Sequence, residues 1–145
     1  MIESKYTANI HKKLPRHIYK WKISDSYAGG VPDAFYRNLN GGSPLWVEYK
    51  FIKNIPKRDT TMIVPNLSAQ QLIWLKQAEK SGENAIVVIG CENLKANRNP
   101  AGVILSGLEE WEQGITTGEF ELRAKGADYQ SIADAIERAT TRRHA

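Results

Sequence analysis

The sequence is poor in the residues that build disulfide frameworks and zinc sites. Its 145 residues include one cysteine, Cys91, and three histidines that have no metal-ligand spacing with one another or with Cys91. This excludes an internal disulfide and a zinc site made of several thiolates. No apolar run approaches the roughly 20 residues of a membrane span, and the first residues lack an apolar signal region. We therefore expect a soluble, cytoplasmic protein with no membrane partner.

Several common catalytic patterns are missing as well. The sequence contains no G-x-S-x-G nucleophile turn, no Walker A loop and no dinucleotide-binding glycine pattern. Hydrophobic residues make up 41% and charged residues 25% of the chain, which excludes a disordered protein because enough apolar surface is present to offset the entropy of ordering. The length and the absence of repeats or linkers indicate a single domain over residues 1–145.

Positive charge exceeds negative charge and is unevenly distributed. The chain has 20 Lys and Arg against 16 Asp and Glu, a formal charge of +4, and a pI near 9.2. Basic residues gather within 5–22 and again within 50–58, whereas acidic residues gather within 109–121. This distribution is typical of a protein that binds a polyanion. Mild basicity that only solubilises the protein is the alternative.

Hydrophobic periodicity predicts a mixed α/β fold. In chain order the expected elements are a helix over 2–14, strands over 17–23, 31–39 and 45–52, an irregular connection over 56–65, a helix over 68–81, strands over 85–89 and 103–105, a helical turn over 108–113 and a closing helix over 129–139. We expect 17–23 to be half-buried, with Tyr19 and Trp21 on its apolar face, and 114–118 to be a turn. The α-β-β-β-α-β order predicts a mixed central sheet flanked by helices.

The third expected strand carries an unusual polar face. Glu48 and Lys50 are two residues apart, so both side chains leave the same side of the strand. Asp33 opens the preceding strand of the hairpin, within the segment Val31-Pro32-Asp33, and comes beside Glu48. Two carboxylates are the ligands that Mg²⁺ prefers, and an amine nearby would orient the attacking water. An ordinary cross-strand ion pair on a solvated face is the alternative.

Two polar residues fall on apolar helix faces. Glu3 lies within the stripe that includes Tyr6 and Ile10, and Gln71 lies near the centre of the apolar face of helix 68–81. Both are costly to bury without a partner or a metal. The alternatives are a frayed, solvated Glu3 and an S-x-x-Q capping box between Ser68 and Gln71.

The aromatic residues have a simpler interpretation at this level. We expect the tryptophans to pack in the core or at sheet edges rather than to stack on bases: Trp21, Trp46, Trp74 and Trp111. Tyr27 and Tyr36 flank the hairpin and could either pack or contact a nucleotide. Cys91 follows a buried strand and is expected to be inert.

The ordered motifs G-V-P-D, W-V-E-Y-K, L-S-x-x-Q-x-x-W-L and G-x-x-A-I-V-V-I resemble the PD-(D/E)xK nuclease superfamily. More narrowly, the sequence is similar to phage and virus-type replication-repair nucleases and to Holliday junction resolvases. The resemblance covers residues 3–90, leaves 91–145 as a family-variable extension, and implies a restriction-endonuclease-like fold.

The resemblance also implies roles for individual residues. Asp33 and Glu48 correspond to the metal ligands, with the carbonyl of Tyr49 as an additional ligand, and Lys50 corresponds to the catalytic lysine. Gln71, with Gln70 as the alternative register, matches the helix glutamine. Glu3 matches the glutamate of the first helix and is a further expected metal ligand.

Together these observations predict a Mg²⁺- or Mn²⁺-dependent DNA endonuclease in which water attacks the phosphodiester directly. By resemblance we expect branched DNA as substrate, a homodimer that makes paired cuts, and the cytoplasm of a host cell as location if the gene belongs to a phage. The residues expected to bind the DNA backbone are Lys12, Lys13, Arg16, Lys53, Lys57 and Arg58. The alternatives are a non-catalytic nucleic-acid-binding domain of the same fold and a sequence-specific restriction-type endonuclease.

Overall fold

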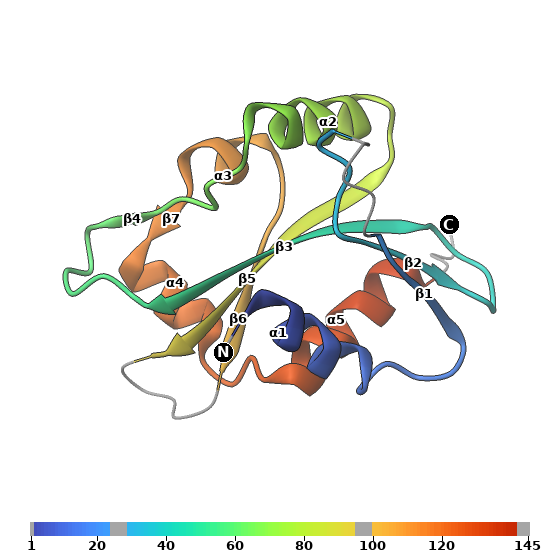
Figure 1. Cartoon of the computed structure of the whole chain (residues 1–145), viewed down its shortest axis with the longest axis horizontal. Helices are drawn as coiled ribbons and strands as arrows, with labels where there is room; N and C mark the ends of the chain where they lie inside the picture. Colours follow the sequence, from blue (N-terminus) through green and yellow to red (C-terminus); the bar gives the residue numbers. More distant parts are fainter. Residues whose placement is uncertain (1, 24–28, 95–99, 142–145) are drawn as a thin grey trace.

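A computed structural model describes residues 2–23, 29–94 and 100–141 of the chain. Its centre is a five-stranded sheet with the strand order β1-β2-β3-β5-β6 (Figure 1). The strands of this sheet are β1 (Ile18–Lys22), β2 (Ala34–Asn38), β3 (Leu45–Asn54), β5 (Asn84–Asn93) and β6 (Ala101–Leu105). β3 and β5 are parallel and the other neighbours are antiparallel. The expected mixed sheet and the α-β-β-β-α-β order are confirmed.

Helices cover both faces of this sheet. The helices are α1 (Glu3–His11), α2 (Ala69–Lys80), α3 (Leu108–Gln113), α4 (Thr117–Ala124) and α5 (Tyr129–Thr140). In Figure 1, α1 and α5 lie below the sheet, and α2 and α3 lie above it. The expected bounds of α2, α3 and α5 hold to within about one residue, as does the N-cap at Asp128, whose side chain accepts a hydrogen bond from the Ser131 N–H.

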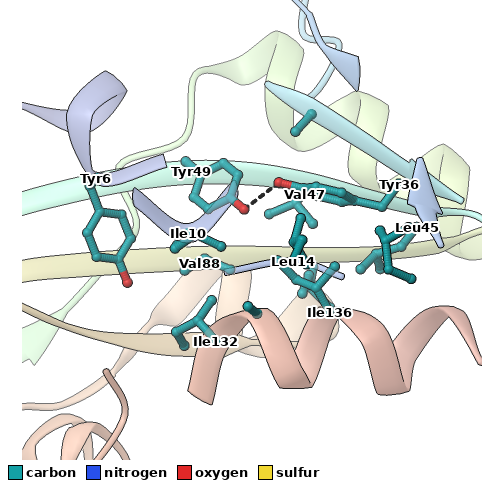
Figure 2. Close-up of a cluster of buried hydrophobic side chains, with 14 residues drawn as sticks. Tyr6, Ile10, Leu14, Tyr36, Leu45, Val47, Tyr49, Val88, Ile132 and Ile136 are labelled. Carbon is teal, nitrogen blue, oxygen red and sulfur yellow. Dashed lines mark hydrogen bonds between the residues drawn. The ribbon is translucent and has the colours of Figure 1, made fainter. Parts of the chain in front are cut away.

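Successive side chains of a strand point to opposite faces of the sheet, and each face carries its own hydrophobic core. On the α1/α5 side, Val47 and Tyr49 of β3 and Val88 of β5 pack with residues of the two helices (Figure 2). On the other side, Val87 and Ile89 of β5 pack with residues of α2, α3 and α4. β5 is therefore buried on both faces, as its continuous apolar run predicts. β3 turns Glu48 and Lys50 toward α2.

The expectation that the first strand is half-buried was wrong. Only Ile18 of β1 is buried, while Tyr19 and Trp21 are 43% and 50% exposed. The reason is that β1 is an edge strand of the sheet, so its outer residues have neighbours on one side only. Alternation in the sequence cannot distinguish an edge strand from a central one.

The expected turn over 114–118 is instead a short strand and the start of a helix. β7 (Ile115–Thr116) pairs with β4 (Met62–Ile63), and α4 begins at Thr117. The Thr116 hydroxyl accepts a hydrogen bond from the Glu119 N–H, a helix N-cap that the T-x-x-E pattern contains. Thr117 donates its hydroxyl to the Thr61 carbonyl at 2.7 Å. The C-terminal segment thus holds the long connection between β3 and α2.

Within residues 2–23, 29–94 and 100–141, no helix combines the length and the apolar character needed to cross a membrane. Tyr27, expected either to pack or to contact a nucleotide, lies outside the described residues.

Candidate catalytic site

The hairpin of β2 and β3 brings Asp33 and Glu48 to one place. Glu48 lies in the middle of β3, between β2 and β5, and is 2% exposed. Asp33 precedes β2, and its Oδ2 accepts a hydrogen bond of 2.9 Å from the Tyr49 backbone N–H. Its carbonyl accepts a second bond of 2.7 Å from the Ile23 N–H just after β1. Backbone groups on both sides therefore fix the position of Asp33.

Gln71 links α2 to this carboxylate. Its Nε2 donates to Glu48 Oε2 at 2.8 Å, and its Oε1 accepts from Lys50 Nζ at 3.1 Å. The same Oε1 accepts from the Ser68 N–H at 2.9 Å and completes a capping box. The Gln71 side chain thus completes the capping box and also contacts Glu48 and Lys50. Gln70, the alternative register, is exposed.

Lys50 lies beside the same two residues. Its Nζ is 3.7 Å from Glu48 Oε2, and its side chain is 23% exposed. Glu48 and Lys50 leave one face of β3, as expected, but the pair is not a solvated surface ion pair because Glu48 is buried. The carboxylate, the amine and the Gln71 amide form one connected group.

Glu3 joins this group from the first turn of α1. Burial, together with the neighbouring Asp33 carboxyl, raises the pKa of Glu3 to about 7, while Lys50 opposes the shift. Glu3 is half-buried and is not a frayed, solvated residue. The structure therefore brings together all five side chains of the expected catalytic group: Glu3, Asp33, Glu48, Lys50 and Gln71.

The carboxyl groups of this cluster are costly to ionise where they lie. Burial, together with the Asp33 and Glu3 carboxyls, raises the pKa of Glu48 to about 8 against the effect of Lys50. Among the described residues, Glu48 Oε1 is buried without a hydrogen-bond partner. A buried, unpaired carboxylate oxygen is costly. A divalent cation would remove this cost, so the residues present fit a Mg²⁺ or Mn²⁺ ion.

The carboxylates do not form a complete cage. In the described part of the chain, no three His, Cys, Asp or Glu side chains are gathered closely enough to hold a metal by themselves. Mg²⁺ commonly binds through one or two carboxylates and keeps several waters. Two carboxylates, a backbone carbonyl and solvent are therefore a suitable ligand set, and a full protein cage is not required.

A metal-free sample should lose stability as the pH rises. Unfolded carboxyls ionise near pH 4.5, whereas the pKa values of Glu3 and Glu48 in the folded protein are about 7 and about 8. Between these limits the folded state binds more protons, so this contribution is full below about pH 4.5 and is lost as the pH passes about 8. Thermal unfolding in EDTA at pH 5.5, 7 and 8.5 should show a falling Tm.

Magnesium should reverse that trend, because the cation replaces protons on the carboxylates and its affinity rises with pH. The increase in Tm caused by Mg²⁺ should therefore be larger at pH 8.5 than at pH 5.5. An equal increase at both values would contradict the assignment of these carboxyls to a metal site.

A hydrogen-bonded chain of two tyrosine hydroxyls and a histidine lies on the other face of β3 and was not predicted from the sequence. The Tyr49 and Tyr36 hydroxyl groups are 2.6 Å apart (Figure 2). The Tyr36 hydroxyl is also 2.6 Å from His11 Nε2. Tyr36 is fully buried, so of its two expected roles it packs. The chain lies on the core face of the strand that carries Glu48 and Lys50, and it fixes Tyr49, whose N–H holds Asp33.

The expected DNA-binding residues lie in two separate places. Lys12, Lys13 and Arg16 follow α1, whereas Lys53, Lys57 and Arg58 lie at and beyond the end of β3; all six are exposed. In Figure 1 the segment that follows α1 lies below the sheet, whereas the connection that follows β3 lies at the left of the view.

Comparisons with known proteins find similarity of fold among solved structures. No protein-family model matches the chain, and no curated protein does. Among solved structures, the chain is similar to a Holliday junction resolvase from the archaeon Archaeoglobus fulgidus, with a TM-score of 0.49 and 16% sequence identity over 91% of this chain and 94% of that one.

Proposed function

We propose that the protein is a Mg²⁺- or Mn²⁺-dependent DNA endonuclease that cleaves branched DNA. The observation that supports this most directly is the buried group around Glu48. Burial and neighbouring carboxyl groups raise the pKa of Glu3 and of Glu48 there, one buried oxygen of Glu48 lacks a partner, and a lysine and a glutamine amide lie in contact. In its ionised form this combination is costly to fold around unless a cation occupies it.

Asp33 and Glu48 would hold the ion, with the Tyr49 carbonyl as a further ligand and Glu3 beside Asp33. When bound, the metal lowers the pKa of its water and stabilises charge on the phosphate oxygens. The hydrogen bond from the Tyr49 N–H leaves only one oxygen of Asp33, Oδ1, free of that contact. Gln71 keeps Glu48 in position through its Nε2.

Lys50 supplies the positive charge that phosphodiester hydrolysis requires. Its ammonium has three donors, of which one is used by Gln71 Oε1. The remaining donors are available to orient the attacking water or to stabilise the negative charge that develops on the phosphate. Because Lys50 and Glu48 leave the same face of β3, both would act on one phosphate.

The preference for branched DNA and the dimer belong to the same proposal. We expect the protein to contact mainly phosphates, which favours selection by DNA shape. Resolving a four-way junction takes two symmetrical cuts, so two copies related by a twofold axis would be needed.

A cleavage panel with an Asp33→Asn variant tests the function. We expect wild-type protein to cut four-way, forked or flap DNA in Mg²⁺ but not in EDTA, at fixed low salt. Asp33→Asn should lower the rate by about 100-fold or more. Asp134→Asn, an exposed carboxylate on α5, serves as the matched control and should keep full activity.

Other results would identify the alternatives. Shifted but uncut DNA in Mg²⁺ would indicate a non-catalytic binding domain. Discrete fragments from plasmid DNA, without preference for branches, would indicate a restriction-type enzyme. Full cleavage by Asp33→Asn would refute the assignment of this site.

A further inference from the structure

Four aromatic side chains form a continuous row across the sheet. The ring centroids of Trp21 and Phe35 are 6.5 Å apart, those of Phe35 and Trp46 are 4.8 Å apart, and those of Trp46 and Trp74 are 5.1 Å apart. The row, called the aromatic ladder below, runs from β1 over β2 and β3 to α2. All three contacts are tilted toward edge-to-face geometry, which aromatic pairs prefer.

The aromatic ladder lies on the same side of the sheet as the candidate site. Trp21 is opposite Phe35, and Phe35 is opposite Trp46, so the three side chains share one face. Trp46 precedes Glu48 by two residues on β3, and side chains at this spacing leave the same face. DNA bound at Glu48 and Lys50 would therefore extend naturally toward the ladder.

The inner and outer ends of the ladder differ in burial. Trp46 and Trp74 are half-buried, as expected for packing residues, but Trp21 on the edge strand is 50% exposed. Next to it on β1, Tyr19 is 43% exposed and lies under the Arg37 guanidinium, 5.1 Å from the ring centroid. The outer end thus combines exposed π-faces with a positive charge, which suits a nucleic-acid base followed by its phosphate.

A second copy of the chain is a poorer occupant of this surface. β1 is an edge strand, but it carries Lys20 and Lys22, both exposed. Lysines on an edge strand disfavour pairing with another strand.

We propose that Trp21, at the outer end of the aromatic ladder, stacks on the exposed face of a base at a branch point of the DNA bound in the candidate site. This inference rests on the proposed function for its substrate. Neighbouring strands are about 4.8 Å apart, so Trp21 lies about 10 Å to the side of β3, the length of about three stacked bases. Trp21 thereby favours branched over continuous DNA, because an unbroken duplex offers no free base face.

The test compares Trp21→Leu with Trp21→Phe, because leucine keeps an apolar side chain and phenylalanine keeps a π-face. Binding is measured by fluorescence anisotropy in EDTA on forked DNA, a single strand and a linear duplex of equal length. Trp21→Leu should weaken binding to the fork and the single strand by about 10-fold, and Trp21→Phe by less than about 3-fold. Neither should change binding to the duplex. Leu122→Ala, an exposed apolar residue on α4, should bind like wild type.

Three results would overturn the proposal. They are unchanged binding of Trp21→Leu to all DNAs, an equal loss on fork and duplex, and a smaller oligomer for Trp21→Leu without DNA, which would assign the surface to a second copy. Because binding is measured without metal, its outcome is independent of hydrolysis. Full cleavage by Asp33→Asn would remove the proposed function and leave the stacking result standing.

Discussion

Replacing Glu48 with glutamine is expected to abolish cleavage and, at the same time, to stabilise the metal-free protein at pH 8. Burial and the neighbouring carboxyls raise the pKa of Glu48 to about 8, so the folded protein prefers its uncharged form. Glutamine reproduces that form: its carbonyl still accepts from Gln71 Nε2, and its amide N–H takes the place of the carboxyl proton. The unfavourable ionisation is removed, whereas a ligand for the cation is lost.

Cleavage and stability should therefore move in opposite directions. We expect cleavage to fall by about 1,000-fold or more and the Tm in EDTA at pH 8 to rise by about 5 °C. The gain should vanish near pH 5, where Glu48 is protonated in the wild type, and Mg²⁺ should no longer raise the Tm. Glu83→Gln, an exposed residue before β5, is the control and should change neither property. A lower Tm for Glu48→Gln in EDTA would show that the ionised carboxylate is well accommodated without metal.

The sequence predicts the positions of those site residues that are fixed by strand periodicity or by a helix cap. The period of two places Glu48 and Lys50 on one face of β3, and the hairpin register places Asp33 at its start. The S-x-x-Q pattern fixes Gln71 at the beginning of α2. The contact between Gln71 and Glu48 could not be predicted in this way, because it depends on how α2 lies over the sheet. The same holds for Glu3, whose neighbour Asp33 is far away in sequence.

The sequence is less informative about features that depend on where an element lies in the tertiary structure. Alternation in 17–23 predicts a strand with Trp21 on its buried, apolar face, but at the sheet edge Trp21 is 50% exposed. The segment 114–118 begins and ends with glycine, which predicts a turn, yet Thr116 caps α4 and Thr117 is buried against Thr61. His11, Tyr36 and Tyr49 are distant in sequence, and only the packing of α1 on the sheet brings their polar groups together.

The carboxyl groups of the candidate site repel one another when they are ionised and no cation compensates their charge. Lys50 lowers the pKa of Glu48 but does not offset burial and two nearby carboxyls. The backbone must hold these groups together against that repulsion. Asp33 is held by the Tyr49 N–H and Gln71 by the cap of α2. The contact between the loop before β2 and the start of α2 is therefore part of the architecture of the candidate site.

Gly30 is the residue at that contact, and Gly30→Ala is expected to damage both folding and activity. Its φ of +83° is a conformation that residues with a side chain rarely adopt. A Cβ there would lie 2.3 Å from the Gln70 carbonyl oxygen and 3.0 Å from the Gln71 backbone nitrogen. Both are main-chain atoms at the start of α2, so the helix would have to move. Gln71 would then leave Glu48 and Lys50.

The Gly41→Ala variant separates the effect of backbone strain from that of a collision between the new Cβ and the main chain of α2. Gly41 has a φ of +95°, but a Cβ there would meet nothing within 4 Å, so only backbone strain of about 1 kcal/mol is expected. Gly30→Ala should cost about 3 kcal/mol or more in urea unfolding, since strain and collision add, and it should reduce cleavage by about 10-fold or more at a temperature where the variant is folded. Gly41→Ala should cleave like wild type. If the two variants proved equally stable and equally active, α2 would not be seated on this glycine, and Gln71 would not depend on it to reach Glu48.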